Sequence, residues 1–596
     1  MTATRIGAVV VPAVPSPRPA PRGRRARPAP CASTGPGEPL ISFRVLRRTW
    51  TPTGSCPPPN ARYDTTTSTA RRWSRASRRG TFMRARSIAT ATATALALVA
   101  ARDLVQKKHA LLRNFPVIGH ARYLLETIGP ELRQYIVTSN DEERPFSRDQ
   151  RTWIYASSKG ENNYFGFGTD NDVEHMQGHA YLKQRTFAGP LPDVHDPQAP
   201  LPSAKVLGGP RGRAKAFRPA SVVNISAMSF GSLSGAAITA LNKGAALAGT
   251  MQNTGEGGLS PYHRNGGDLV LQIGTAYFGC RNEDGTFNID KLKDVVASAP
   301  VKAIEIKLSQ GAKPGLGGML PAAKVTEEIA GIRGIPLGKD CASPSRHTAF
   351  SDVDSMLDFV ELLATETGLP VGIKSAVGEM EFWQELATLM ARGDRGVDFV
   401  TVDGGEGGTG AAPLIFSDSM SLPFRMGFSR VYGTFAELGL TDDLTFIASG
   451  KLGLPENAAV AFALGADMIN VAREAMLSIG CIQAQKCHTD KCPTGIATQN
   501  PRLARGLDPT SKATRAAVYL RTLRKELLKV SAAVGVAHPA LLTPTDVEIM
   551  NGDYEARTLA GVYGYKDGWG ELGPHLAEEI TTLLTTESAP APKPIV

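Results

Sequence analysis

The stretch VDFVTVDGGEGGTG, residues 397–410, joins a short apolar strand to a loop of glycine, acidic and threonine residues. The same pairing of an apolar run with a glycine-rich or polar ending recurs from about residue 220 onward. The runs that predict strands are SVVNISAMSF (221–230), GTMQNTG (249–255), DLVLQIG (268–274), AIEIKLS (303–309), PVGIKSA (370–376), VDFVTVDGG (397–405), LTFIASG (444–450) and ADMINVA (466–472).

Helical patterns separate these strands, over Ala236–Ala248, Ala322–Ile332, Val353–Thr367, Glu379–Arg392 and Glu456–Leu464. Such alternation over roughly 250 residues is typical of a (β/α)8 barrel, although a doubly wound sheet gives the same local pattern. Nearly every strand ends in Gly, Ser, Asn, Lys or Asp, and in a barrel all these ends meet on the face where active sites are built. We therefore expect an α/β fold of the (β/α)8 TIM-barrel type.

Two late glycine loops, TVDGGEGGTGAAP (401–413) and IASGKLG (447–453), predict a phosphate site. Glycine lets backbone N–H groups converge on an anion, and the helix expected from Pro455 adds a favourable dipole. The loops after the last strands of a barrel frequently hold a cofactor phosphate. The alternative is that the glycines only make tight turns.

A third loop, EIKLSQGAKPGLGGMLP (305–321), carries Lys307, Gln310 and Lys313 among its glycines. Cations and amide donors at that face suit a carboxylate substrate or an anionic flavin ring. Simple solvation of the lysines is the alternative.

Three of the seven cysteines lie in GCIQAQKCHTDKCPTG (480–495), spaced C-x5-C-x4-C. Seven is too few, and odd, for a disulfide-stapled secreted protein, so we expect a reducing cytosol. The spacing does not match the paired knuckles of structural zinc sites, whereas thiolates are the usual ligands of iron–sulfur clusters. A cluster with one corner missing is favoured; a zinc site that adds His488, or three structural cysteines, are the alternatives.

The net charge of +10 is concentrated at the N-terminus. Residues 1–82 hold 15 Arg against Glu38 and Asp64, or +13, which leaves 51 basic against 54 acidic residues, or −3, for the rest. The globular part is therefore near neutral, and we expect no nucleic-acid partner.

We expect four parts along the chain. Residues 1–82 are Arg- and Pro-rich and predict a disordered extension, either untranslated sequence before a start at Met83 or a transit peptide. Residues 83–145 predict a helical segment that packs on the main domain, with Ser87–Ala101 a weak membrane anchor or an ordinary helix. Residues 146–520 form the barrel domain with the cysteine loop, and 521–596 a helical segment and tail.

Five motifs, in order, resemble the FMN-binding synthase domain of glutamate synthase: SAMSFGSLS (226–234), NTGEGG (253–258), IKLSQGAKPGLGGMLPAAKV (306–325), VTVDGGEGGTGAAP (400–413) and GCIQAQKCHTDKCPTGIATQ (480–499). The likeness covers about residues 145–506. With HALLRNFPVIGHARYLLE (109–126) ahead of it, the chain from Met83 is similar to the stand-alone FMN-binding glutamate synthase family proteins.

The resemblance implies a mechanism. Reduced FMN would deliver hydride to 2-iminoglutarate, formed from 2-oxoglutarate and ammonia, to give L-glutamate. A 3Fe-4S cluster on Cys481, Cys487 and Cys492 would return electrons to the flavin. Gln310, Lys313 and Arg333 would hold 2-oxoglutarate, and Glu256 and Lys313 would be catalytic. FMN would be held by Ala227, Met228, Ser229, Lys374, Gly404, Gly405, Ser449, Gly450 and Lys451.

Two further observations concern the sources of ammonia and of electrons. Nothing in residues 1–220 supplies a glutamine-hydrolysing domain, so ammonia would come from solution or a separate glutaminase subunit. No dinucleotide fingerprint stands in the required context, so electrons would come from ferredoxin or an NADPH-dependent reductase subunit. Two other functions stay open: an N-methylglutamate synthase-like enzyme that uses another amine, and an electron-transfer subunit without turnover. His263, His347 and Cys341 are expected to be structural.

Overall fold

In this computed structural model, residues 67–188, 201–552 and 554–586 are described. The chain divides into two compact units, Met1–Val117 and Ile118–Val596. The second unit contains the barrel and every predicted site residue.

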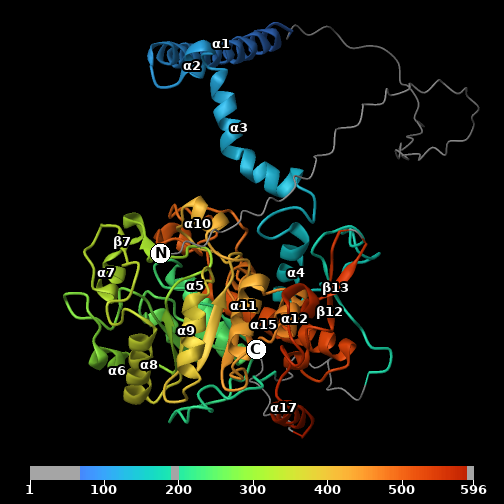
Figure 1. Ribbon diagram of the computed structural model, residues 1–596. Coiled ribbons are helices and arrows are strands. Elements are labelled where there is room, and N and C mark those ends of the chain that lie inside the picture. Colours follow the sequence, from blue (N-terminus) through green and yellow to red (C-terminus); the bar gives the residue numbers. More distant parts are fainter. Residues whose placement is uncertain (1–66, 189–200, 553, 587–596) are drawn as a thin grey trace, which may run out of the picture. The chain divides into compact units, whose positions relative to one another are not determined.

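Eight parallel strands close into a barrel in the second unit (Figure 1). The closed order is β10-β11-β2-β3-β4-β5-β8-β9, which is chain order once the short β6 and β7 are set aside. Seven of the eight predicted runs contain one of these strands, and the run at 303–309 overlaps β5. The strands are β2 (Val223–Ile225), β3 (Gln252–Asn253), β4 (Leu269–Ile273), β5 (Val301–Lys307), β8 (Val371–Ser375), β9 (Phe399–Asp403), β10 (Thr445–Ser449) and β11 (Met468–Val471). The predicted (β/α)8 barrel is therefore confirmed.

The strands are apolar runs because both of their faces are covered, as in other parallel sheets. Side chains inside the barrel include one polar layer centred on the buried Glu305 of β5. Its carboxylate accepts hydrogen bonds from Asn253 (2.8 Å), Gln272 (2.6 Å) and Thr401 (2.7 Å), which lie on three other strands. This layer ties the strands together beneath the face that carries the site.

Helices surround the barrel, as Figure 1 shows for α5, α9, α11 and α12. The helices of this layer are α5 (Gly235–Ala248), α6 (Ile289–Ala297), α8 (Val353–Thr367), α9 (Glu381–Met390), α11 (Phe424–Ala436), α12 (Pro455–Ala463) and α13 (Arg473–Ser478). Ser and Asp side chains begin several of them; Ser234, for example, accepts a hydrogen bond from the Ala237 N–H at the start of α5.

A long insertion between β5 and β8 forms one wall of the site. It contains β6 (Met319–Leu320), η3 (Ala322–Lys324), α7 (Glu327–Arg333) and β7 (Cys341–Ala342), with β6 and β7 paired antiparallel. The single helix expected over Ala322–Ile332 is thus divided into η3 and α7. Arg333 is the last residue of α7, and Gly334 ends the helix in a left-handed conformation (φ 62°).

The C-terminal part departs from the expectation of a purely helical segment. α15 (Pro509–Val534) packs on α5 and crosses the boundary expected at residue 520. Beyond it, β12 (Val547–Met550) pairs with β13 (Ala556–Thr558) and with the distant β1 (Ala180–Leu182). The remaining elements are α10 (Leu414–Ser419), α14 (Pro501–Ala504), α16 (Leu559–Tyr563), α17 (Pro574–Thr586), and the short turns η2 (Pro261–His263) and η4 (Pro539–Leu541).

The N-terminal segment is helical from Thr67. α1 (Thr67–Val105) takes in residues 67–82 of the extension expected to be disordered, and residues 1–66 lie outside the described part. α2 (Ala110–Asn114), α3 (Gly119–Leu132), η1 (Arg133–Val137) and α4 (Arg148–Lys159) follow. In α3 the side chains of Leu124 and Leu125 are about 60% exposed.

Candidate active site

The carboxyl ends of the strands bring the predicted site residues to one face of the barrel. Lys307, at the end of β5, pairs in register with Lys374 on β8. Asp403, at the end of β9, pairs with Ser449 on β10. Charged and hydroxyl side chains from four neighbouring strands therefore lie near the carboxyl ends of those strands.

Glu256 and Lys307 form an ion pair at the centre of this face. The Lys307 Nζ lies 2.6 Å from Glu256 Oε1 and 3.0 Å from Gln310 Oε1. Two glycines leave room for the carboxylate, because a Cβ at Gly274 or Gly318 would come within about 2.6 Å of its oxygens. The geometry thus joins the predicted Glu256 and Gln310 through Lys307.

The carboxyl of Glu256 is held ionised by its surroundings. Burial raises its pKa, but the ion pair with Lys307 and the charges of Arg333 and Lys313 outweigh this and lower the pKa below the ordinary value of 4.5. Glu256 is therefore a carboxylate at neutral pH, able to accept a proton or a hydrogen bond.

Lys313 and Arg333 are buried cations without an acidic partner. Each side chain is under 10% exposed. Within the described part of the chain, Lys313 Nζ makes no hydrogen bond or ion pair, and burial followed by repulsion from Lys307 lowers its pKa. Arg333 stacks on Phe278, donates to the Phe230 carbonyl at 3.1 Å and leaves its Nε without a partner.

Such a pair of buried charges is costly unless an anion compensates it. Both act electrostatically on Glu256, which is already neutralised by Lys307. The face therefore has an excess of positive charge around one carboxylate.

Lys374 is neutralised within the protein. Its Nζ lies 3.5 Å from Asp403, which also accepts hydrogen bonds from Ser449 Oγ (2.7 Å) and the Gly311 N–H (2.9 Å). Burial lowers the pKa of Lys374, but the charges of Asp403 and Glu305 outweigh it and raise the pKa. Lys374 is a fixed ammonium at the barrel mouth.

The two late glycine loops meet as predicted, but some of their backbone N–H groups form hydrogen bonds within the protein and others are free. The Gly404 N–H donates to the Ser449 carbonyl, and the Gly405 N–H to that of Leu422. The expectation that the backbone amides of these two glycines hold a phosphate is therefore not supported. In the described residues the N–H groups of Gly450 and Lys451 make no hydrogen bond, and Gly450 has φ 134°, which favours glycine.

Two cations flank these free amides. Lys451 and Arg473 each lie about 5 Å from the ring of Phe146. Burial lowers the pKa of Lys451, and repulsion by Arg473 lowers it further. Free N–H groups beside two cations that repel each other form an arrangement that suits a phosphate.

Ala227, Met228 and Ser229 follow β2 on the same face. Ser229 meets the NTGEGG loop closely, since a Cβ at Gly255 would lie 2.6 Å from the Ser229 nitrogen. A Cβ at Gly257 would meet both Ser229 Cβ (2.8 Å) and an Arg333 nitrogen (2.9 Å). These glycines allow the segment after β2 and the loop that carries Glu256 to contact Arg333, which lies in the insertion between β5 and β8.

The three cysteines lie close enough to affect one another. Burial, and then the neighbouring thiols, raise the pKa of Cys481 to about 12, whereas hydrogen bonds from Thr494 and nearby amides offset burial and lower the pKa of Cys492. No group of three His, Cys, Asp or Glu residues in the described ranges could hold a single metal ion. A cluster differs from an ion, because each thiolate binds a different iron and the ligands lie farther apart.

The residues expected to be structural have interior contacts. His263 is fully buried, bonds to Ser260, and has its pKa lowered to about 4 by burial. His347 bonds to the Lys307 carbonyl at 2.9 Å and to the Tyr277 hydroxyl at 3.1 Å. His347 thereby supports the strand end that carries Lys307.

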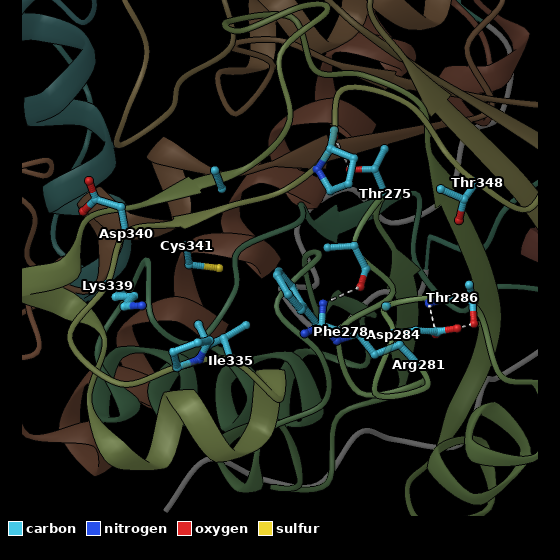
Figure 2. Close-up of a pocket in the computed structure, with 15 residues that line it drawn as sticks. Thr275, Phe278, Arg281, Asp284, Thr286, Ile335, Lys339, Asp340, Cys341 and Thr348 are labelled. Atoms are coloured by element: carbon cyan, nitrogen blue, oxygen red, sulfur yellow. Dashed lines mark hydrogen bonds between the residues drawn. The ribbon is translucent and has the colours of Figure 1, made fainter.

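A cavity of about 420 Å³ is lined by residues from 275–286 and from 335–348 (Figure 2). Phe278 and Cys341, which both contact Arg333, also line it. Figure 2 shows Phe278, Arg281 and Asp284 on one side, and Ile335, Lys339 and Cys341 on the other. Two of the residues that line the cavity therefore also contact Arg333.

Comparison with known proteins agrees with this geometry. The model of the conserved region in glutamate synthase matches residues 209–537, more than half of the chain. The chain is 40% identical, over 74% of its length and 89% of the relative's, to a glutamate synthase large subunit-like protein, YerD, of Bacillus subtilis.

The chain belongs to the glutamate synthase family.

This family member also resembles other proteins over part of its length. It is 34% identical to an archaeal-type glutamate synthase [NADPH] of Thermotoga sp., over 58% of the chain, and spans only 64% of that relative. Among solved structures, a flavocytochrome b2 with sulfite bound matches 68% of the chain and 83% of its own at 15% identity and a TM-score of 0.39. The family indicates an oxidoreductase.

Three residues of this glutamate synthase family site were not among the site residues predicted from sequence. Lys307 was noted only as part of a cationic loop, although it pairs with Glu256. Asp403 opens the quoted glycine loop and pairs with Lys374. Arg473 follows β11. Its position just after a predicted strand, where polar residues follow the other strands, was the signal that could have identified it.

Proposed function

We propose that this glutamate synthase family member converts 2-oxoglutarate and ammonia to L-glutamate, with FMN as the hydride donor and a 3Fe-4S cluster as the electron relay. The observation that carries the proposal is the pair of buried, unneutralised cations, Lys313 and Arg333, beside an ionised Glu256. The two carboxylates of 2-oxoglutarate supply two negative charges, which would compensate both cations.

Each residue has a role that follows from its contacts. Arg333, whose guanidinium carbon lies 5.2 Å from the centre of the Phe278 ring, offers a planar fork to one carboxylate, and Lys313 a point charge to the other. Gln310 is oriented by Lys307 and its amide is available to the substrate. Glu256 can accept the proton released when the amine nitrogen attacks the keto carbon, because its carboxylate is ionised.

The described residues fit FMN. The free amides of Gly450 and Lys451, with Lys451 and Arg473 beside them, would bind its phosphate. Lys374, fixed by Asp403, would face the ring, and Ala227–Ser229 would line it. When bound and reduced, FMN supplies the hydride for the imine carbon.

The cysteine loop fits a cluster better than a single ion. Cys481, Cys487 and Cys492 interact with one another, while no single-ion group exists in the described ranges. We propose that the cluster receives electrons from ferredoxin or an NADPH-dependent reductase subunit, and that ammonia comes from solution or a separate glutaminase.

Turnover with different amines tests the proposal. Anaerobically reconstituted protein with a chemical electron donor should form L-glutamate from 2-oxoglutarate and ammonium. Product from methylamine but none from ammonium would instead show an N-methylglutamate synthase-like enzyme. Electron transfer from flavin to an acceptor, with no 2-oxoglutarate-dependent product from either amine, would leave only the electron-transfer function.

A further inference from the structure

One part of α1 has the length and composition of a membrane span. Residues Arg86–Val105 are 20 residues long and apolar enough to cross a membrane. At 1.5 Å per residue this corresponds to about 30 Å, the thickness of the hydrocarbon core. Ser87–Ala101 carries no charged side chain.

Three polar side chains of this stretch form hydrogen bonds within the N-terminal unit. The hydroxyls of Thr90 and Thr92 donate to the carbonyls four residues earlier, each at 2.9 Å. Asp103 is buried, and its carboxylate accepts the Val117 N–H at 3.0 Å. Internal hydrogen bonding of this kind is what a lipid environment requires. The large side chains Ile88, Leu96 and Leu98, however, are 48–68% exposed.

α3 presents a second exposed apolar face soon afterward in the chain. Ala121, Leu124, Leu125, Ile128 and Leu132 recur at helical spacing and share one side of the helix. The four large side chains are 39–61% exposed. The opposite side carries polar residues, including the ion pair between Arg122 and Glu126.

Basic residues flank the apolar stretch at both ends. Arg84 and Arg86 precede it, and Lys107, Lys108 and Arg113 follow it before α3. Cations beside an apolar helix are attracted to anionic lipid headgroups. A protein partner would explain the exposed apolar faces. It would not explain why the length of the helix matches the thickness of the hydrocarbon core, or why basic residues flank the apolar stretch.

We propose that the N-terminal helices bind the enzyme to an anionic lipid bilayer, with Arg86–Val105 crossing the membrane and the apolar face of α3 lying in its interface. η1, which follows α3, connects this segment to the cysteine loop: Gln134 and Tyr135 both donate to the Ile482 carbonyl, at 3.2 and 2.9 Å. Attachment would therefore hold the cysteine loop near the membrane surface.

Membrane extraction of the full chain is the first test. We expect the protein in the membrane fraction of expressing cells, resistant to alkaline carbonate, with residues 86–105 detected in the protein by mass spectrometry. Release into the carbonate supernatant would overturn the span. Cleavage after this stretch would identify a signal sequence and overturn the anchor.

A substitution pair tests the helix itself. Leu96→Arg with Leu98→Arg places two charges mid-span, and each should lower the inserted population on the order of a hundredfold. The matched control is Leu362→Arg with Leu438→Arg, two leucines of the catalytic unit that are 44% and 45% exposed. The control should remain in the membrane; equal loss from both variants would contradict the proposal.

Vesicle flotation tests α3 in the Leu96→Arg, Leu98→Arg background. We expect this variant to float with vesicles that contain phosphatidylglycerol and not with pure phosphatidylcholine at moderate salt. Adding Leu125→Asp and Ile128→Asp should abolish flotation. The result that would overturn the interfacial role is a Leu96→Arg, Leu98→Arg protein that binds no vesicles and forms a dimer. If Leu125→Asp and Ile128→Asp dissociate that dimer, the apolar face of α3 binds a second copy of the chain.

Discussion

We expect Lys313 to bind the substrate and to lower the stability of the ligand-free protein. Its buried ammonium has no partner in the described chain, so Lys313→Met should stabilise the ligand-free protein and raise its Tm by a few degrees. The same change should raise the KM for 2-oxoglutarate on the order of 10- to 100-fold. Differential scanning calorimetry and steady-state kinetics measure the two effects.

The control for that variant is Lys302→Met, at a half-exposed lysine that lies 4.0 Å from Asp268. It should change neither quantity measurably. A Lys313→Met protein with unchanged KM and a lower Tm would show that Lys313 serves the fold rather than the substrate.

Lys307 sets the protonation of Glu256. In the wild type the lowered pKa of Glu256 stabilises the fold at neutral pH, and this contribution is lost as pH falls below the ordinary value of 4.5. Lys307→Met removes the main opposing charge, so burial should raise the pKa of Glu256. The acidic limb of the pH–rate profile should then move to higher pH, and the cost at neutral pH should be on the order of 3 kcal/mol.

Profiles of kcat/KM and of Tm against pH, between about pH 4 and pH 8, check this prediction. Lys307→Arg keeps the ion pair and should keep the wild-type limb. An acidic limb unmoved in Lys307→Met would show that Glu256 does not control the rate.

At the scale of elements, the cysteine loop depends on the segment before α4. Gln483 is buried, accepts the Phe146 N–H at 3.1 Å and donates to the Phe146 carbonyl at 3.0 Å and to Glu143 at 2.8 Å. Tyr155 adds a hydrogen bond to the Cys481 carbonyl. Two segments more than 300 residues apart in sequence thus hold each other.

Gln483→Ala should loosen this contact, because it leaves the Phe146 amide and carbonyl unpaired at about 1–3 kcal/mol each. Cys481, whose thiol pKa is raised to about 12 mainly by burial, should then react faster with iodoacetamide in cluster-free protein. Mass spectrometry gives the rate, and Gln384→Ala on the exposed side of α9 is the control. Equal rates in both variants would refute the supporting role of Gln483.

The elements also show what a single sequence can and cannot predict. The eight barrel strands were predictable because each is an apolar run closed by a polar or glycine ending. β1, β12 and β13 were not, because they are short and because β12 pairs with β1 across more than 350 residues of sequence. The pairing of Lys307 with Glu256 and of Lys374 with Asp403 depends on strand register, which local patterns do not specify.

At the scale of the whole molecule, positive charge is concentrated in two places, one for each proposed function. The near-neutral part after Met83 contains the barrel, whose positive face is local to Lys313, Arg333, Lys451 and Arg473. The basic residues before it adjoin the helix for which we propose membrane binding. Substitutions in one part should leave the other unchanged: Leu96→Arg with Leu98→Arg should prevent insertion of the helix, so that high salt releases the enzyme, while keeping kcat/KM within about twofold. Assays of the released protein check this, and a large loss of activity would show that the two parts are coupled.

The central claim is reductive amination of 2-oxoglutarate at the Glu256 face. The most direct measurement is a single turnover: the flavin-loaded protein is reduced with dithionite without air, mixed with 2-oxoglutarate and ammonium, and followed by flavin absorbance and by the glutamate formed. We predict reoxidation of the flavin with one glutamate for each flavin reoxidised, and none in Glu256→Gln. A flavin that stays reduced with ammonium in the wild-type protein would contradict the account.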